Sequence, residues 1–142
     1  MVRDYKDLVA WQRGIELARA VYCLTPLFPS DERFGLSQQM RRAAVAIPSN
    51  IAEGHERRSR ADYKRFVAMA CGSVAEVETQ LEPAVQLGFV ERHAIDEAVS
   101  LCGEVGRMLR GLERALREAP AIREGAGVNV LLPQPSTLSP QP

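Results

Sequence analysis

The sequence predicts an all-α fold, an up-down-up-down antiparallel four-helix bundle whose second helix carries an internal proline. Apolar residues recur at steps of three and four in four separate stretches of the chain, and this spacing lines one face of an α-helix. Short connecting segments separate the stretches, which favours antiparallel neighbours in a bundle. The 142 residues, of which 46% are hydrophobic, are enough for one domain with its own core.

The first helix is expected to end near Pro26 and to have two apolar faces. The residues of the first face are Leu8, Trp11, Ile15, Ala18 and Tyr22. The second face, on another side of the same helix, consists of Leu17, Val21, Leu24 and, just past the helix end, Phe28. Two apolar faces require two burial partners. We therefore expect the second face to form a contact between copies of the chain.

The second helix is expected to run from about Ser30 to Gly54, or into the charged segment ERRSR that follows. Its apolar residues are Leu36, Met40, Ala43, Ala44, Ile47 and Ile51. Pro48 lies inside this pattern, where a proline removes one backbone hydrogen bond and presses against the carbonyl of Ala44, at a cost of about 3 kcal/mol or more. We expect a kink there, with a polar group or a water near the unpaired carbonyl.

The third helix is expected to begin at Ser59, because this hydroxyl and the carboxylate of Asp62 approximate a capping box. Its apolar residues are Tyr63, Val67, Ala70, Val74, Val77, Leu81 and Ala84. Pro83 is expected to loosen the last turn, and Gly88 to end the helix. We interpret Gly72 as a small residue that lets a neighbouring helix come close.

The fourth helix is expected to begin near Glu91, and its apolar residues recur at the same steps of three and four. Its apolar residues are Ala98, Cys102, Val105, Leu109, Leu112 and Leu116. The bundle is therefore predicted at residues 1–118. Residues 119–142 hold five of the nine prolines and show no helical period, so they are predicted to form a disordered C-terminal tail.

The composition predicts a cytoplasmic protein. The first ten residues carry charges of both signs and resemble no signal peptide, and no apolar run approaches the roughly 18 residues needed to span a membrane. The three cysteines, Cys23, Cys71 and Cys102, are too few and too far apart for a disulfide framework or a zinc site. Each falls on or beside an apolar stripe, and we interpret all three as core residues.

The sequence has none of the patterns that indicate catalysis, a metal or a cofactor. It contains no Glu-x-x-His pair, no glycine-rich phosphate loop and no Gly-x-Ser-x-Gly motif. His55 and His93 each follow a glutamate by two residues, a spacing that turns the two side chains to different sides of a helix. We therefore expect no enzyme and no cofactor.

The eighteen basic and eighteen acidic residues give a net charge of zero, but the two signs are separated along the chain. Residues 41–65 hold seven cations and three carboxylates, whereas residues 73–105 hold one cation and seven carboxylates. The seven cations are Arg41, Arg42, Arg57, Arg58, Arg60, Lys64 and Arg65. They either contact the phosphates of a nucleic acid or face solvent and acidic neighbours. Between stacked copies, the basic region of one and the acidic region of the next would be complementary.

Four segments of the chain closely resemble one protein family. They are DLVAWQRGIELARAVYCLT, FGLSQQMRRAAVAIPSNIAEG, ERRSRADYKRF and ACGSVAEVETQLEPAVQLGFV. The chain resembles, from roughly Asp7 to Leu116, the four helix bundle protein family, also called the 23S rRNA intervening-sequence protein family. The resemblance implies a small cytosolic bacterial protein with an up-down bundle fold, commonly assembled as a ring of five. Some members are encoded inside an insertion in the gene for the large ribosomal RNA.

A related bundle, the accessory protein of diversity-generating retroelements, is a basic pentamer that binds its reverse transcriptase and nucleic acid. The resemblance therefore implies that this chain's partner is itself, in a homo-oligomer of five copies, with RNA or an RNA-associated protein as a further partner. We predict a noncatalytic homo-oligomeric interaction protein. The alternative is an RNA-associated protein that binds phosphates through the basic corner between helices two and three.

The IPSNIAEG block of the family corresponds to residues 47–54 and suggests a polar cluster of Arg42, Pro48, Asn50 and Glu53. Asn50 and Glu53 are three residues apart and share a helix face. We expect Arg41 or Arg42 to pair with Glu53. Pro83 departs from the family pattern, which has an ordinary helix former there.

Overall fold

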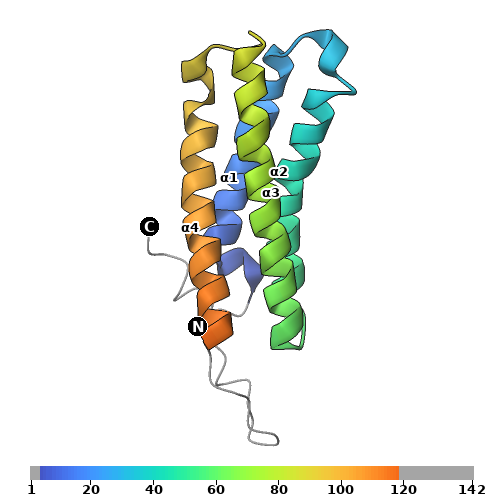
Figure 1. Cartoon of the computed structure of the whole chain (residues 1–142). Coiled ribbons are helices and arrows are strands. Elements are labelled where there is room, and N and C mark those ends of the chain that lie inside the picture. Colours follow the sequence, from blue (N-terminus) through green and yellow to red (C-terminus); the bar gives the residue numbers. More distant parts are fainter. Residues whose placement is uncertain (1–3, 119–142) are drawn as a thin grey trace, which may run out of the picture.

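The structure is a computed structural model that describes residues 4–118, and these residues form four α-helices (Figure 1). The helices are α1 (Val9–Leu24), α2 (Leu36–His55), α3 (Arg60–Gln86) and α4 (Asp96–Glu118). Short 3-10 helices lie at Tyr5–Asp7, Thr25–Leu27, Ser30–Glu32 and Arg92–Ile95. The prediction of an all-α chain with four helices is confirmed, and the described residues contain no strand. The tail predicted at 119–142 lies outside the described residues.

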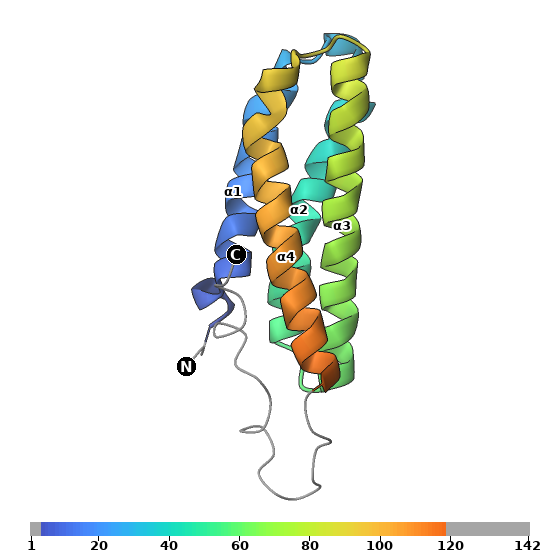
Figure 2. The same ribbon diagram turned by 60° about the vertical axis from the view of Figure 1, so that its left-hand side comes forward.

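The four helices lie side by side along most of their length. Helix α1 packs mainly against α2 and α4, and α3 packs mainly against the same two helices. Figures 1 and 2 show the α1–α2 and α3–α4 connections at one end of the bundle, which we call the upper end, and the α2–α3 connection at the other. As a result, the α1–α2 pair and the α3–α4 pair form opposite faces of the molecule.

Side chains and one glycine fix three of the helix boundaries. The Ser59 hydroxyl accepts a hydrogen bond from the Asp62 amide at 3.0 Å, so α3 is capped where the sequence predicts. Gly88, just beyond α3, has a φ of +78°, the left-handed conformation that commonly follows a helix end. Helix α2 begins later than expected, because the Glu32 carboxylate accepts a hydrogen bond from the Leu36 amide at 3.0 Å and caps the helix there.

Pro48 lies inside α2 and is buried against α1. A Cβ atom added to Gly14 of α1 would lie 3.5 Å from Cβ of Pro48 and 3.4 Å from Cγ2 of Ile47. These are ordinary van der Waals distances, so the proline ring packs close to the α1 backbone at Gly14. Burial of the ring offsets part of the cost of placing a proline in a helix.

The inward face of α1 is the opposite of the one that we expected. Leu17 and Val21 are completely buried in the chain's own core, and Leu24 and Phe28 are buried with them. The prediction that Leu17, Val21, Leu24 and Phe28 form a contact between copies is therefore wrong. Because α1 packs against both α2 and α4, its inward face is the one that points between those two helices. On the other face, Ile15 is 43% and Tyr22 48% exposed, whereas Leu8, just before the start of α1, is buried in the core.

The interpretation of the three cysteines as core residues is confirmed for Cys102 and wrong for Cys23. Cys102 is buried, Cys71 is half-buried and Cys23 is exposed. Burial raises the pKa of the Cys102 thiol to about 12, so very little thiolate forms there at neutral pH.

We expect a thiol reagent such as Ellman's reagent, applied at pH 8, to modify Cys23 quickly and Cys102 only after unfolding. The number of thiols titrated over time in buffer and in guanidinium chloride measures both rates. Cys23→Ser should remove the fast phase, and modification of Cys102 at the rate of Cys23 in native protein would contradict the expectation.

Candidate interaction surfaces

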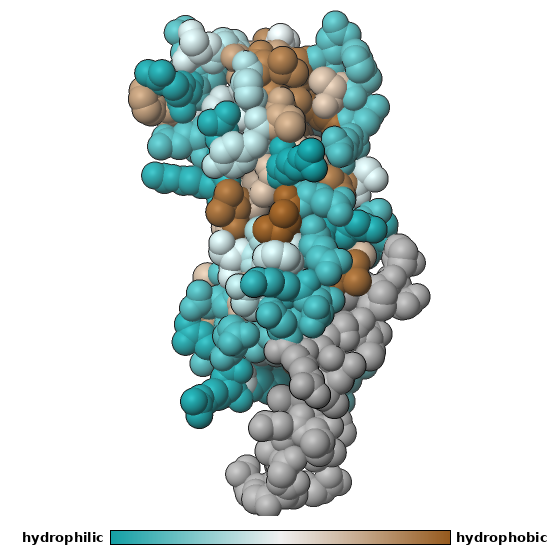
Figure 3. Space-filling view, turned by 180° about the vertical axis from the view of Figure 1, so that it is seen from behind, coloured by the Kyte–Doolittle hydropathy of each residue, from teal (hydrophilic) through white to brown (hydrophobic). Residues whose placement is uncertain are grey.

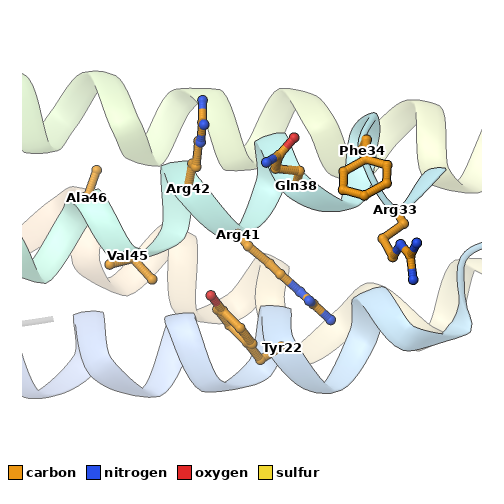
Figure 4. A pocket seen from close by; sticks show the side chains of 8 residues that line it. All are labelled: Tyr22, Arg33, Phe34, Gln38, Arg41, Arg42, Val45 and Ala46. Atoms are coloured by element: carbon orange, nitrogen blue, oxygen red, sulfur yellow. The ribbon is translucent and has the colours of Figure 1, made fainter.

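A hollow of about 510 Å³, which we call the arginine hollow, lies near the upper end of the α1–α2 face (Figure 4). It is lined by Tyr22, Arg33, Phe34, Gln38, Arg41, Arg42, Val45 and Ala46. Gln38, Arg41 and Val45 follow steps of three and four along α2 and therefore share its outward face. Arg33 and Phe34 reach the hollow from the α1–α2 connection.

Two of the three arginines are positioned by their neighbours. Nε of Arg41 donates a hydrogen bond to Oγ1 of the buried Thr25 at 2.7 Å, and its guanidinium lies 4.6 Å from the centre of the Tyr22 ring. The guanidinium of Arg33 lies 4.9 Å from the centre of the Phe34 ring. Figure 4 shows Arg41 pointing from α2 toward Tyr22 of α1, whereas Arg42 points to the other side of α2.

Within residues 4–118, no carboxylate neutralises the positive charge of the hollow. No acidic residue lines the hollow, and within residues 4–118 none of its three arginines forms an ion pair. Phe34 is 75% exposed beside these charges. Arginine and aromatic side chains of this kind are enriched where proteins bind other molecules.

An apolar groove continues from the hollow along α1 and α2, and we call it the apolar strip. It is lined by Tyr5, Trp11, Ile15, Ala18, Val45, Pro48, Ser49 and Ala52. Val45 belongs to both the strip and the hollow, so the two form one surface. Figure 3 views the molecule from behind, the side on which α1 lies in Figure 1, and shows hydrophobic side chains in the upper and middle parts of that side.

The structure does not bring the seven predicted nucleic-acid-binding residues together. Arg41 and Arg42 line the hollow, whereas Arg57, Arg58, Arg60, Lys64 and Arg65 lie around the α2–α3 connection, at the opposite end of the bundle. Fifteen residues separate Arg42 from Arg57, which corresponds to about 20 Å along a helix. The basic corner around the α2–α3 connection is thus a separate surface with five of the seven cations.

Part of the charge of the basic corner is paired within the chain. Arg57 lies 2.9 Å from the Glu53 carboxylate, and Arg65 lies 3.7 Å from that of Asp62. The guanidinium groups of both arginines also lie over the Phe66 ring, 4.8 and 4.6 Å from its centre.

Arg58 and Lys64 of the basic corner differ from Arg57 and Arg65 in their lack of an ion pair within the described residues. They are therefore the corner cations with the most freedom to contact a phosphate.

The expected pairing of Arg41 or Arg42 with Glu53 is wrong. Glu53 pairs with Arg57 instead, and Arg42 lies three helical turns earlier on α2, about 16 Å away along the helix axis. Pro48 is buried and Asn50 is half-buried. The four residues Arg42, Pro48, Asn50 and Glu53 thus do not share one polar site.

A groove of about 300 Å³, which we call the acidic groove, lies near the upper end of the opposite, α3–α4 face. It is lined by Glu78, Leu81, Glu82, Arg92, Ile95, Asp96 and Val99. The Glu82 carboxylate accepts two hydrogen bonds from Arg92, at 2.8 and 2.9 Å, and these bonds lower the pKa of the Glu82 carboxyl.

The acidic groove has an excess of negative charge, because three carboxylates and one arginine line it. Glu78 and Asp96 form no ion pair within residues 4–118. Val99, which also lines the groove, is 47% exposed. The groove therefore combines negative charge with an exposed apolar side chain.

The described residues contain no candidate for a metal site or for a membrane-spanning helix. Within residues 4–118, no three histidine, cysteine, aspartate or glutamate side chains are grouped so that they would hold a metal ion. None of the helices in this range combines the length and the apolar character needed to cross a bilayer.

Comparison with known proteins identifies the family. A family model described as 23S rRNA-intervening sequence protein matches residues 6–111. A crystal structure of a protein of unknown function, from the S23 ribosomal protein family of Bacteroides thetaiotaomicron VPI-5482, has a TM-score of 0.69 and 22% identity; the match covers 74% of this chain and 98% of that one. At this identity the likeness shows the fold alone. A search of curated proteins gave no match. The matched residues 6–111 include all of α1, α2 and α3, and the chain belongs to the 23S rRNA-intervening sequence protein family.

Proposed function

We propose that the chain is a noncatalytic cytoplasmic protein that assembles with copies of itself through the α1–α2 face and serves as an interaction module. The observation that carries this proposal is the apolar surface formed by the apolar strip and the adjoining Tyr22 of the arginine hollow. The four helices already close a core, yet Ile15, Tyr22 and Val45 remain 43%, 48% and 43% exposed on one face. A contiguous exposed apolar surface of this kind marks a protein interaction site. The number of copies that we propose, five, follows the resemblance to the family.

The apolar residues available for assembly differ from those that the apolar spacing of α1 predicts. Leu17, Val21, Leu24 and Phe28 are occupied in the core and contribute nothing to a surface. Ile15 and Tyr22 lie on the other face of α1, and Val45 adds an apolar side chain from α2.

The variant Ile15→Asp with Val45→Asp tests this proposal, because two carboxylates in a buried interface would be strongly unfavourable. Multi-angle light scattering after gel filtration should give about five times 15.7 kDa for the native chain and about 15.7 kDa for the variant. Met69→Asp, an equally exposed site on α3, is the control and should keep the native mass. A monomeric native chain at high concentration, or an assembled double variant, would contradict the proposal.

A second candidate function is RNA binding through the basic corner. Arg58 and Lys64 lie close together in sequence, next to Arg57 and Arg65, and have no intramolecular carboxylate partner among the described residues. Unpaired cations at one end of the bundle are available for phosphate contacts, which release counterions and make binding depend on salt.

The variant Arg58→Glu with Lys64→Glu should weaken binding to a single-stranded RNA oligonucleotide and reduce the slope of log affinity against log salt by about 1.4, or 0.7 per contact. Fluorescence anisotropy between 50 and 200 mM KCl measures both quantities. The matched control is Arg107→Glu with Arg110→Glu, which reverses two exposed arginines on α4. Absence of binding at low salt, or equal losses in both variants, would reject this second function.

A further inference from the structure

We infer that the arginine hollow of one copy receives the acidic groove of the next copy, so that self-association is head-to-tail. The inference rests on the proposed self-association and names the surface that covers the α1–α2 face. Three arginines line the hollow, and none of them forms an ion pair within the described residues. The groove is lined by three carboxylates, of Glu78, Glu82 and Asp96, and by one guanidinium group, of Arg92, so negative charge is in excess there. The two surfaces are thus complementary in charge, which favours their association and fixes its register.

The two surfaces also lie at the same height on the bundle. Arg33 and Phe34 belong to the α1–α2 connection, and Arg92 belongs to the α3–α4 connection. Figure 1 shows both connections at the upper end. Two copies that stand side by side in the same orientation therefore bring hollow and groove together without sliding along each other.

The position of the surfaces on opposite faces excludes the simplest symmetric dimer. A two-fold contact would place hollow against hollow and bring like charges together. A head-to-tail contact instead uses a different face of each copy, and such contacts repeat until they close a ring or continue as a filament. Because hollow and groove lie at equal height, successive copies are not shifted along the helix direction, and a rotation between copies about an axis parallel to the helices then closes the assembly into a ring.

Apolar side chains in both surfaces provide the contact area that charge alone does not. Val99 is 47% exposed in the groove, and Phe34 is 75% exposed at the hollow. Burying these side chains removes apolar surface from water, while the surrounding ion pairs select the partner surface. Arg41, bonded to Thr25 and stacked on Tyr22, is already ordered before the partner arrives.

Charge reversal tests the inference. One variant carries Arg33→Glu with Arg42→Glu, which makes the hollow acidic, and the other carries Glu78→Arg with Asp96→Arg, which makes the groove basic. Each variant alone should have the mass of a monomer by native mass spectrometry, because its hollow and groove then carry the same sign. An equimolar mixture should assemble into species with equal numbers of the two chains, since each reversed surface meets a complementary one only in the other variant. A single chain with all four substitutions should also assemble.

Controls separate this result from damage to the fold. Arg58→Glu with Lys64→Glu makes the same change of charge at the other end of the bundle and should leave the native mass unchanged. Circular dichroism should show native helix content for every variant. If Asp96→Arg weakens the start of α4, Arg42→Glu and Glu78→Arg provide the same test as single substitutions.

The results that would contradict the inference distinguish an error in the proposed self-association from an error in the inferred pairing of surfaces. A monomeric native chain would reject the proposed self-association itself. An assembled native chain whose hollow variant or groove variant keeps the native mass would overturn only the inferred pairing of surfaces. The same conclusion would follow if folded variants stay monomeric after mixing, or if reversal of the hollow abolishes only RNA binding.

Discussion

Replacing Leu17 with alanine is expected to lower the free energy of unfolding by about 3 to 5 kcal/mol. Leu17 is completely buried between α1 and its neighbours, so truncation removes apolar contacts and leaves a cavity that the surrounding core fills only in part. Unfolding in urea, followed by circular dichroism, measures the loss. The experiment also tests the correction of the α1 face, because a residue in a contact between copies would affect assembly more than stability.

Ile15→Ala is the matched control, since Ile15 is two residues away on the outward face of the same helix. We expect it to change the stability of the single chain by less than about 1 kcal/mol, because the side chain is 43% exposed. Both variants must be compared under conditions in which the chain is monomeric. Equal losses of stability at Leu17 and Ile15 would contradict the assignment of the two faces.

The second large effect is expected at Gly54, where α2 and α3 come close together. A Cβ atom added to Gly54 would lie 2.8 Å from Cβ of Phe66 and 3.1 Å from Cδ1 of Tyr63. The Cβ of Phe66 is fixed to the α3 backbone, so the two helices would have to move apart. We expect Gly54→Ala to destabilise the chain by about 1 to 3 kcal/mol through overpacking.

At Gly72, the same substitution by alanine should raise the stability of the chain instead of lowering it. We expected Gly72 to permit close approach of another helix, but a Cβ atom added there would meet nothing within 4 Å. Gly72→Ala should therefore stabilise the monomer by about 0.5 to 1 kcal/mol, because alanine loses less backbone entropy in a helix than glycine. The denaturant midpoints of Gly54→Ala and Gly72→Ala show whether each substitution lowers or raises the stability. A loss of stability in Gly72→Ala would refute this account.

The helices were predictable because each carries a regular stripe of apolar residues, whereas the start of α2 depends on one side-chain contact. The carboxylate of Glu32 accepts a hydrogen bond from the amide of Leu36, the first residue of α2. The spacing of apolar residues does not predict such a bond. Periodicity likewise showed two faces on α1 but not which face points inward. That choice depends on the placement of α2 and α4, which only the tertiary structure gives.

The candidate surfaces were predictable in part. The separation of basic and acidic segments was visible in the sequence, and the steps between Phe34, Gln38, Arg41 and Val45 would have indicated the outward face of α2. Tyr22, which comes from α1 to stack with Arg41, could not be found in this way because the two residues are distant in sequence. Charge along the chain also grouped Arg42 with Arg57, although the length of α2 places them at opposite ends.

The apolar strip contains Trp11, the single tryptophan of the chain, with its ring centre 5.5 Å from that of Tyr5. Indole emission shifts to shorter wavelength when water is removed from around the ring. The native protein therefore has a label-free optical reporter at the surface in question, and a blue shift of its fluorescence upon concentration would follow subunit contact as it forms.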